Sequence, residues 1–483
     1  MSTLKQRTIT GLKWGTYERL TSYGITFVVS LIIARILSPA DYGIVAMIAI
    51  FMGISHVLVE GGFGSALIKK LDRTETDFAT VFYYNIAVSL LFYGLLFAIA
   101  PMIARFYEMP ILVNITRVVG LGIVIGAFGA IHKTKLNIAI DFKTQTKVSM
   151  IALFVSGALG ITMAYTGFGV WALVFQGLTS VLISTVLLWL FLRWRPLPVF
   201  SASSFRELFG FGSKIMLAGL LNTIYDNIYA MVIGKKFSAS DLGFYARADS
   251  FAKLPSLNIS MVIQKVTFPV LSEIQDDIPR LTSSYRQLLK MTAFIVFPVM
   301  VFLAALGKPL IEFLLTEKWL PAVPLMQILS FGLMFFPIHA INLNLLQVIG
   351  RSDLFLRLEI IKKAMITTVL FITTGFGIIY ICLGIVLSSL IALIINTHYT
   401  GKFINVGLVR QLMDIIPMLV ISIVSGAVAF LPTILVSNLI LQLLCGAISG
   451  VAVYWGLSKI FGIEQLEEIM KLMKKRFLKN YNL

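Results

Sequence analysis

The sequence carries few charged residues for its length. Only 13% of its 483 residues are Asp, Glu, Lys or Arg, whereas 58% are hydrophobic. Soluble domains carry about 25% charged residues, so a water-soluble fold of this size could not cover its surface. The composition therefore predicts an integral membrane protein.

Cysteine is equally scarce. Cys382 and Cys445 are the only two, and both lie in apolar stretches. This excludes a disulfide framework and a metal site built on closely spaced cysteines. We expect neither a metal ion nor a cofactor.

Long loops and nucleotide-binding motifs are missing as well. No loop between apolar runs exceeds roughly 25 residues, and no G-x-x-x-x-G-K-[ST] motif occurs. The chain therefore has no room for an extramembrane catalytic domain and no ATPase of its own. An enzyme such as a glycosyl polymerase would need a larger outer loop or paired loop carboxylates, so we predict that the protein is not an enzyme.

What the sequence has in abundance is long apolar runs, each about the 20 residues that a membrane-crossing helix needs. The fold class predicted is an all-α polytopic membrane protein with about 14 transmembrane helices. These are expected near residues 12–36, 42–64, 79–104, 112–131, 148–166, 168–192, 211–234, 244–270, 289–307, 323–349, 360–378, 379–400, 412–431 and 436–458.

The net charge of +17 reflects how Lys and Arg are distributed among the loops. With the N-terminus inside, the inside segments hold 29 of the 40 basic residues and the outside segments 9. This excess predicts a multi-pass membrane protein with both termini cytoplasmic. No basic patch is interleaved with stacking aromatics, so we expect no nucleic-acid partner.

A short pattern occurs twice, 200 residues apart. Residues 33–51 align without a gap to residues 233–251, with six identities that include the Ser-x-x-Asp-x-Gly of "SPADYG" (38–43) and "SASDLG" (238–243). Both copies fall between the first and second span of a six-span set. Ser or Asp is typical of a helix N-cap and Gly of a turn, so we interpret the motif as a helix stop and restart, with substrate contact as the alternative.

Because six spans is an even number, the two halves cross the membrane in the same direction. This predicts two six-helix lobes related by a pseudo-two-fold axis along the membrane normal, plus two extra C-terminal helices. The segments expected are an N-terminal lobe (1–192), a cytoplasmic linker (193–214), a C-terminal lobe (215–400), two additional transmembrane helices (401–461) and an amphipathic basic cytoplasmic tail (462–483) that lies on the inner leaflet.

Several stretches resemble a known family. They are "IIARILSPADYGIVAM" (32–47), "GFGSALIKK" (62–70), "VFYYN" (81–85), "GFGVWALV" (167–174), "RWRP" (193–196), "FPVLSEIQDD" (268–277) and "LPAVPLMQIL" (320–329). In this order they resemble the multidrug/oligosaccharidyl-lipid/polysaccharide exporter superfamily. Within it the chain is most similar to Wzx-like polysaccharide flippases of the colanic acid and teichuronic acid exporter branch.

The resemblance implies a function. It implies a flippase that moves an isoprenoid-pyrophosphate-linked oligosaccharide from the cytoplasmic to the outer leaflet, for surface polysaccharide assembly. Its partners would be that lipid-linked substrate, membrane lipids and downstream polymerase or export proteins. Such a flippase would work by alternating access, whereas composition and the repeat alone support only a two-lobed transporter. A cation-coupled multidrug exporter of the same superfamily is the alternative, and it would require an acidic apolar pocket.

Charged residues inside apolar spans need a reason, because each costs at least about 2.5–3.5 kcal/mol at mid-bilayer. On the eighth span, Asp249, Lys253 and Gln264 share one helical face. The matching face of the second span carries His56 and Glu60. Two matched polar faces indicate a central cavity between lobes, although Asp249 and Lys253 could instead simply pair with each other. His56 and Glu60 form a possible proton relay, but a structural role for His56 alone is the simpler interpretation.

The remaining candidates for substrate binding are spread over other spans. A pyrophosphate favours Arg or Lys, and a sugar favours aromatic platforms together with amide or hydroxyl partners. Arg117 and Arg247 lie near outside ends of spans, so each could instead be an interfacial anchor. The candidates of this group are Glu18, Arg19, Asn85, Arg117, Asp226 and Arg247.

Overall fold

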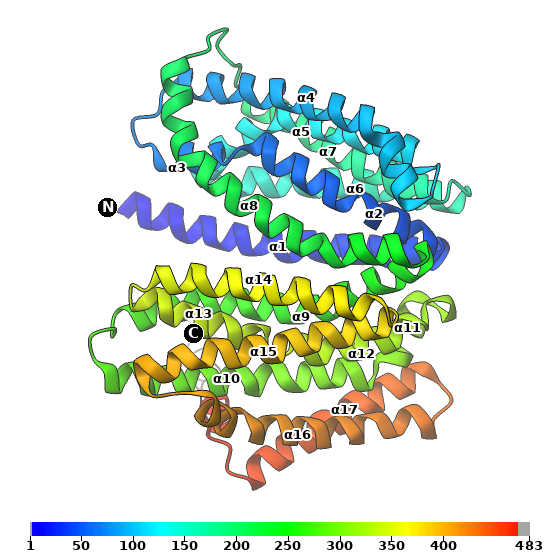
Figure 1. Cartoon of the computed structure of the whole chain (residues 1–483), viewed down its shortest axis with the longest axis vertical. Coiled ribbons are helices and arrows are strands. Elements are labelled where there is room, and N and C mark those ends of the chain that lie inside the picture. The colour runs from blue at the N-terminus through cyan, green and yellow to red at the C-terminus, as the bar shows by residue number, and fades with distance from the viewer. Residues whose placement is uncertain (1, 472–483) are drawn as a thin grey trace. The chain divides into compact units, whose positions relative to one another are not determined.

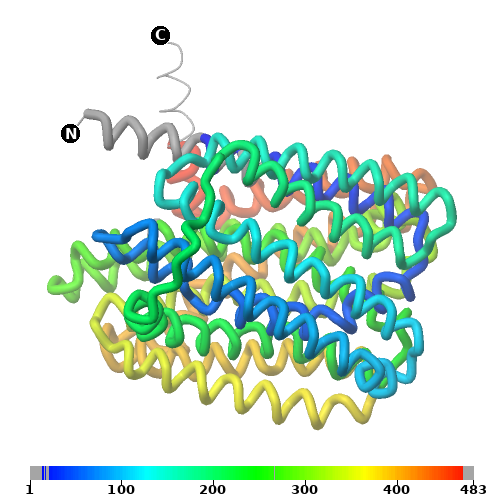
Figure 2. Tube along the Cα trace, turned by 90° about the horizontal axis from the view of Figure 1, so that it is seen from above, coloured from blue at the N-terminus to red at the C-terminus, as the bar shows by residue number. Residues whose placement is uncertain are grey.

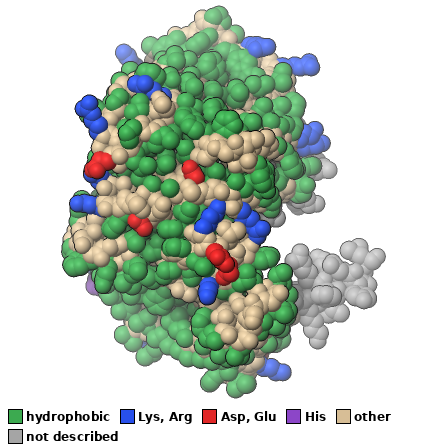
Figure 3. All heavy atoms as spheres, turned by 90° about the vertical axis from the view of Figure 1, so that its right-hand side faces the viewer, with side chains coloured by type: hydrophobic (Ala, Val, Ile, Leu, Met, Phe, Trp, Pro, Cys, Tyr) green, Lys and Arg blue, Asp and Glu red, His purple; other side chains and the backbone are tan. Residues whose placement is uncertain are grey.

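The computed structural model describes the backbone of residues 2–471 and the side chains of that range except residues 2–13, 16, 18–20 and 266. Every regular element in this range is a helix (Figure 1), which confirms the all-α prediction. Apolar side chains occupy most of the face seen in Figure 3, and charged ones gather in a few places. The chain divides into two compact units, residues 1–243 (unit 1) and 244–483 (unit 2).

The helices of unit 1 run alongside one another in Figure 1. They are α1 (Ser2–Ile36), α2 (Pro39–Glu60), α3 (Phe63–Lys69), α4 (Glu75–Tyr107), α5 (Leu112–Ala139), α6 (Phe142–Tyr165), α7 (Val170–Leu192), α8 (Ala202–Lys236) and the first turn of α9 (Ala239–Ser272). One apolar core joins α1, α6 and α7, and a second joins α3, α4, α5 and α8.

Unit 2 holds the rest of α9 and the later helices. They are α10 (Ile278–Ala305), α11 (Gly307–Leu315), the 3-10 helix η1 (Glu317–Trp319), α12 (Ala322–Leu333), α13 (Phe336–Val348), α14 (Ser352–Thr374), α15 (Ile378–Ile404), α16 (Leu408–Leu435) and α17 (Leu439–Ile460).

The number of membrane-crossing helices is close to the predicted fourteen. Within the described residues, eleven helical segments are long and apolar enough to cross a membrane. The other three expected spans form helices α1, α9 and α14, and only residues 21–36 of α1 meet the apolar criterion, over a shorter length. The polar residues of α9 and α14 account for their lower hydropathy.

The repeated motif caps two helices, as predicted. Ser38 and Asp41 form a capping box at the start of α2, in which the Ser38 hydroxyl accepts from the Asp41 amide and the Asp41 carboxylate accepts from the Ser38 amide. Ser238 and Asp241 make the same two bonds at the start of α9. Helix α8 also begins and ends 200 residues after α1, so the sequence repeat is a repeat of helix boundaries.

The glycine of each motif copy packs against the backbone of the other copy. A Cβ added to Gly43 would lie 1.7 Å from the Ala239 carbonyl oxygen, and one added to Gly243 would lie 1.9 Å from the Pro39 carbonyl oxygen. Only glycine permits such an approach. The first turns of α2 and α9 therefore meet backbone to backbone in a reciprocal contact.

Helix α8 packs within unit 1, against α2, α3 and α4. By packing, the division of the chain thus falls at residue 243, whereas the sequence places α8 in a C-terminal lobe over 215–400. A further glycine contact brings α8 close to the start of α3. A Cβ on Gly62 would lie 2.2 Å from the Gly212 carbonyl oxygen. The lobes defined by the repeat stay a prediction.

The two C-terminal helices are integrated into unit 2 through α10. Asp414 on α16 is 4% exposed and accepts two hydrogen bonds from the Arg286 guanidinium, at 2.8 and 2.7 Å. Nearby, the Gln411 amide donates to Asn342 on α13 at 3.1 Å, and Asn342 also accepts from the buried Tyr285 hydroxyl at 2.6 Å. Buried polar groups that are fully paired in this way fix the register of the helices that carry them.

Only the start of the predicted tail lies within the described residues. The segment from 464 to 471 is helical, and its Leu466 is 3% exposed in the unit 2 core. Gln287 on α10 donates to the Glu468 carboxylate at 2.6 Å. Residues 472–483 lie outside the described residues.

The reciprocal glycine contact can be tested by adding a single methyl group. We expect Gly43→Ala to lower the free energy of unfolding by about 1–3 kcal/mol, the usual cost of overpacking, because the Ala239 backbone must move. Gly94→Ala on α4 is the control, since nothing lies within 4 Å of a Cβ there. Thermal unfolding of the purified protein in detergent measures both, and equal stability of the two variants would contradict the contact.

Candidate functional site

Unit 1 contains an open cavity of about 490 Å³. Its wall comes from the end of α2, from α3 and α4, and from long stretches of α5 and α7. The residues that line it are His56, Val59, Glu60, Gly64, Asn85, Gly122, Ile123, Gly126, Ala127, Gly129, Ala130, Ile131, Lys133, Thr134, Asn137, Ser180, Val181, Ser184, Thr185 and Leu188. The size falls within the range of pockets that hold small molecules.

One wall of the cavity exists because α5 presents glycines toward α7. A Cβ on Gly126 would touch Val181 at 3.6 Å, and one on Gly129 would lie 3.0 Å from the Thr185 hydroxyl oxygen. The Thr185 hydroxyl donates to the Ile125 carbonyl at 3.1 Å and ties the two helices together. The α5 glycines therefore act in close helix packing and leave the cavity lined partly by backbone.

The acidic side of the cavity is the end of α2. Glu60 is its last residue, and the His56 ring nitrogen Nδ1 lies 3.9 Å from the Glu60 carboxylate, one turn earlier. Their side chains are 76% and 59% exposed, so the pair is weak by itself. Both residues line this cavity of unit 1, whereas the central cavity between lobes that the sequence indicated for them, and a proton-relay role, stay predictions.

Asn85 on α4 lines the cavity although it is almost fully buried. It is 2% exposed, and its amide nitrogen donates to the Val59 carbonyl at 3.0 Å and to the Val81 carbonyl at 3.3 Å, an orientation assigned from these partners. Its oxygen is left as an acceptor. Asn85 thus joins α4 to the end of α2 at the cavity wall.

The cytoplasmic half of α5, in the predicted orientation, supplies residues that the sequence reasoning missed. Lys133, Thr134 and Asn137 line the cavity together with Ser180 and Ser184 of α7. The spacing of Ser180 and Ser184 at i, i+4 was a usable signal, because it places both hydroxyls on one helix face. Lys133 lies in the segment 132–147, whose basic residues are accounted for by the predicted orientation of the chain.

Of the other predicted site residues in unit 1, Arg117 and Asp226 are not among the residues that line the cavity. Arg117, at the start of α5, stacks on the Phe97 ring at 4.0 Å and its Nε donates to the Phe97 carbonyl at 3.4 Å, which suits an anchor. Asp226 is exposed on α8. Glu18 and Arg19 are on α1, and their side chains lie outside the described residues.

The candidates on α9 belong to unit 2. Lys253 and Asp249 form an ion pair at 2.7 Å, so the simple pairing considered for them is present. Arg247 lies over the Trp319 ring at 5.7 Å, and Gln264 is exposed. Across the described residues, no group of three His, Cys, Asp or Glu side chains is placed to hold a metal ion.

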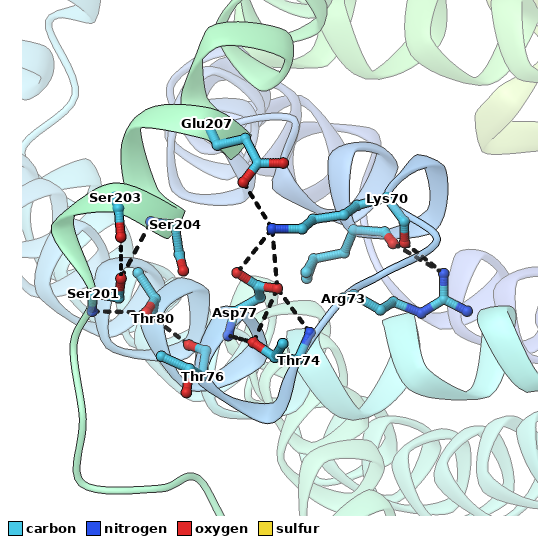
Figure 4. A network of polar contacts seen from close by, with 11 residues as sticks. Lys70, Arg73, Thr74, Thr76, Asp77, Thr80, Ser201, Ser203, Ser204 and Glu207 are labelled. Atoms are coloured by element: carbon cyan, nitrogen blue, oxygen red, sulfur yellow. Dashed lines mark hydrogen bonds and ion pairs between the residues drawn. The ribbon is translucent and has the colours of Figure 1, made fainter.

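A second polar assembly joins the start of α8 to α4 and to the end of α3, all within unit 1. Figure 4 shows the Lys70 ammonium between two carboxylates, 2.7 Å from Glu207 on α8 and 3.3 Å from Asp77 on α4. Asp77 is 1% exposed and also closes a capping box with Thr74. The hydrogen bond to Glu207 raises the pKa of Lys70, against the opposite effect of burial, so this cation stays charged at neutral pH.

The extended segment before α8 is held at two more points. The Trp194 indole donates to the Glu75 carboxylate at 2.7 Å, and Glu75 also accepts from Lys135 at 2.7 Å. The Ser201 amide donates to the Thr80 hydroxyl at 3.0 Å. This segment, residues 193–201, crosses the ends of unit 1 helices (Figure 2) and is called the strap below. Its hydrogen bonds hold it against those helices.

The family model and two of the relatives that match this chain are named for the biosynthesis of polysaccharides. The family model described as "Polysaccharide biosynthesis protein" matches residues 32–324, a range that contains the cavity. The chain is 25% identical over 360 residues to the teichuronic acid biosynthesis protein TuaB of Bacillus subtilis, covering 73% of this chain and 74% of the relative. It is 26% identical over 329 residues to the succinoglycan biosynthesis transport protein ExoT of Rhizobium meliloti, covering 68% and 67%.

A solved structure shares the fold. The lipid II flippase MurJ in an inward closed conformation aligns with a TM-score of 0.76, covering 92% of this chain and 98% of that chain at 16% sequence identity. At this identity the likeness concerns the fold alone.

The Lys70 assembly generates a matched pair of variants. Lys70→Met leaves Asp77 buried without its cation, so we expect a loss of about 2–3 kcal/mol in the free energy of unfolding, the low end for breaking a buried pair because Lys70 is partly exposed. Glu207→Gln removes an exposed partner and should cost less than about 1 kcal/mol. Denaturation in detergent measures both, and equal losses would show that Asp77 does not need Lys70.

Proposed function

Because the chain belongs to the polysaccharide biosynthesis protein family, we propose that it is a transporter that carries a lipid-linked oligosaccharide across the membrane. The observation that carries this proposal is a cavity of about 490 Å³ among apolar, membrane-length helices, whose lining includes the polar side chains of His56, Glu60, Asn85 and Lys133. Polar and charged residues on such helices are costly in a bilayer unless they face a water-filled space or serve a passing polar molecule. The protein is a transporter and not an enzyme.

The finer assignment concerns substrate and direction. The substrate is an isoprenoid-pyrophosphate-linked oligosaccharide, which moves from the cytoplasmic to the outer leaflet of the bacterial inner membrane by alternating access. Support comes from the names of relatives that serve teichuronic acid and succinoglycan biosynthesis. Downstream polymerase or export proteins are the partners that would consume the product.

The orientation follows from the loop charges. With both termini cytoplasmic, α2 ends and α5 ends at the cytoplasmic side, so Glu60 and Lys133 lie where the substrate enters. His56, Glu60 and Asn85 are then the substrate-facing residues of the first unit. The remaining candidates, proposed for substrate contacts outside this cavity, are Glu18, Arg19, Arg117, Asp226, Arg247, Asp249, Lys253 and Gln264.

Gene deletion tests the proposal. We expect loss of surface polysaccharide together with accumulation of polyprenyl-linked oligosaccharide on the cytoplasmic face, because the donor lipid is made but not turned over. Mass spectrometry of extracted lipids and a surface-polysaccharide assay provide the measurement, and a plasmid carrying the wild-type gene is the control. Unchanged polysaccharide with new sensitivity to cationic dyes would instead identify a multidrug exporter.

A further inference from the structure

The cavity of unit 1 has a chemistry that selects one part of such a substrate. We propose that it binds the sugar portion of the lipid-linked oligosaccharide and not its pyrophosphate; this inference rests on the proposed transport function. Two features of the lining carry it: its charge and its hydrogen-bonding groups. Its lack of Phe, Tyr and Trp argues against a planar cation as the ligand.

The charge of the lining is close to neutral. Its ionisable residues are one carboxylate, Glu60, one ammonium, Lys133, and the imidazole of His56. A pyrophosphate carries several negative charges and is best held by clustered Arg and Lys side chains. One exposed Lys does not stabilise such an anion when a Glu in the same lining cancels its charge. An uncharged ligand does not depend on the net charge of the lining.

The hydrogen-bonding groups offer both donors and acceptors, as a polyhydroxylated ligand requires. Asn85 uses its amide nitrogen on two backbone carbonyls, so its oxygen remains to accept. Asn137 uses its oxygen to accept from Gln145 at 2.8 Å, so its amide nitrogen remains to donate. The hydroxyls of Ser180 and Ser184 serve in either role. Sugar hydroxyls, which also donate and accept, match this set.

The residues that line the cavity argue against a flat aromatic cation. No Phe, Tyr or Trp is among them, and a planar cation would be held by aromatic faces. The same absence leaves a sugar without an aromatic platform, so this feature excludes the cation and does not by itself select the sugar. The wall formed by Gly122, Gly126 and Gly129 lets a ligand approach the α5 backbone. A volume of about 490 Å³ suits a small oligosaccharide and leaves the isoprenoid chain in the bilayer.

Protection of an introduced cysteine distinguishes the two parts of the substrate. In a Cys445→Ser background, with the buried Cys382 retained, Ser184→Cys places a thiol on the cavity wall. The full-length protein in nanodiscs is treated with a charged methanethiosulfonate reagent. We expect labelling to slow about tenfold at ten times the Kd of lipid-linked oligosaccharide extracted from the deletion strain. Bare polyprenyl pyrophosphate at the same concentration should leave labelling unchanged.

Two further cysteine variants make the result interpretable. Ser203→Cys, exposed in the first turn of α8, should label at one rate with either lipid, which controls for reagent access. Ser180→Cys lies on the same face as Ser184 and replaces it if Ser184→Cys does not fold.

The unfavourable outcomes are distinct. Equal protection by bare polyprenyl pyrophosphate would overturn the inference in favour of a pyrophosphate site. Protection by neither lipid, while the wild-type gene still restores surface polysaccharide to the deletion strain, would show that the cavity does not hold the sugars although the transport function stands. If the deletion strain accumulates no lipid-linked oligosaccharide, the proposed function fails first.

Discussion

The close contact between two helix starts is the constraint on which the organisation of unit 1 depends. Gly43 and Gly243 each lie against a backbone carbonyl of the opposite motif copy, at a distance that leaves no room for a Cβ. Such an approach works only if both helix ends are rigid and correctly placed. The capping boxes at Ser38 and Ser238 supply that rigidity, because each satisfies two otherwise unpaired groups at the helix terminus. The motif therefore combines a cap with a contact surface.

Much of this organisation could be predicted from sequence because it is local or repeated. Capping boxes depend on residues three apart, and apolar length decides whether a helix can cross a membrane. The offset of 200 residues identified matching helix breaks, which the boundaries of α1 and α8 reproduce. The packing of the two motif copies against each other could not be predicted. A sequence pattern does not show which of many glycines contacts a backbone far away in the chain.

For the same reason, only some of the residues that line the cavity could be singled out from the sequence. His56 and Glu60 stood out as polar residues in an apolar span, and Asn85 as an amide in another. Ser180 and Ser184 did not stand out, because serine is common at helix–helix contacts in membranes. Their role depends on how α7 packs on the α5 glycines. Asp249 and Lys253 were conspicuous in sequence, yet the structure satisfies them largely through each other.

The distribution of charge links the cavity to the strap that precedes α8. Two cations of the first unit at this end are engaged by carboxylates: Lys70 by Asp77 and Glu207, and Lys135 by Glu75. Each engaged cation holds a helix end or the strap in place, and it is then less available to an anionic ligand. The lining of the cavity itself holds one carboxylate, Glu60, and one ammonium, Lys133, beside the imidazole of His56, although the protein as a whole carries a net charge of +17. Net charge therefore describes how the protein sits in its membrane, while the local pairing of charges decides what its cavity can bind.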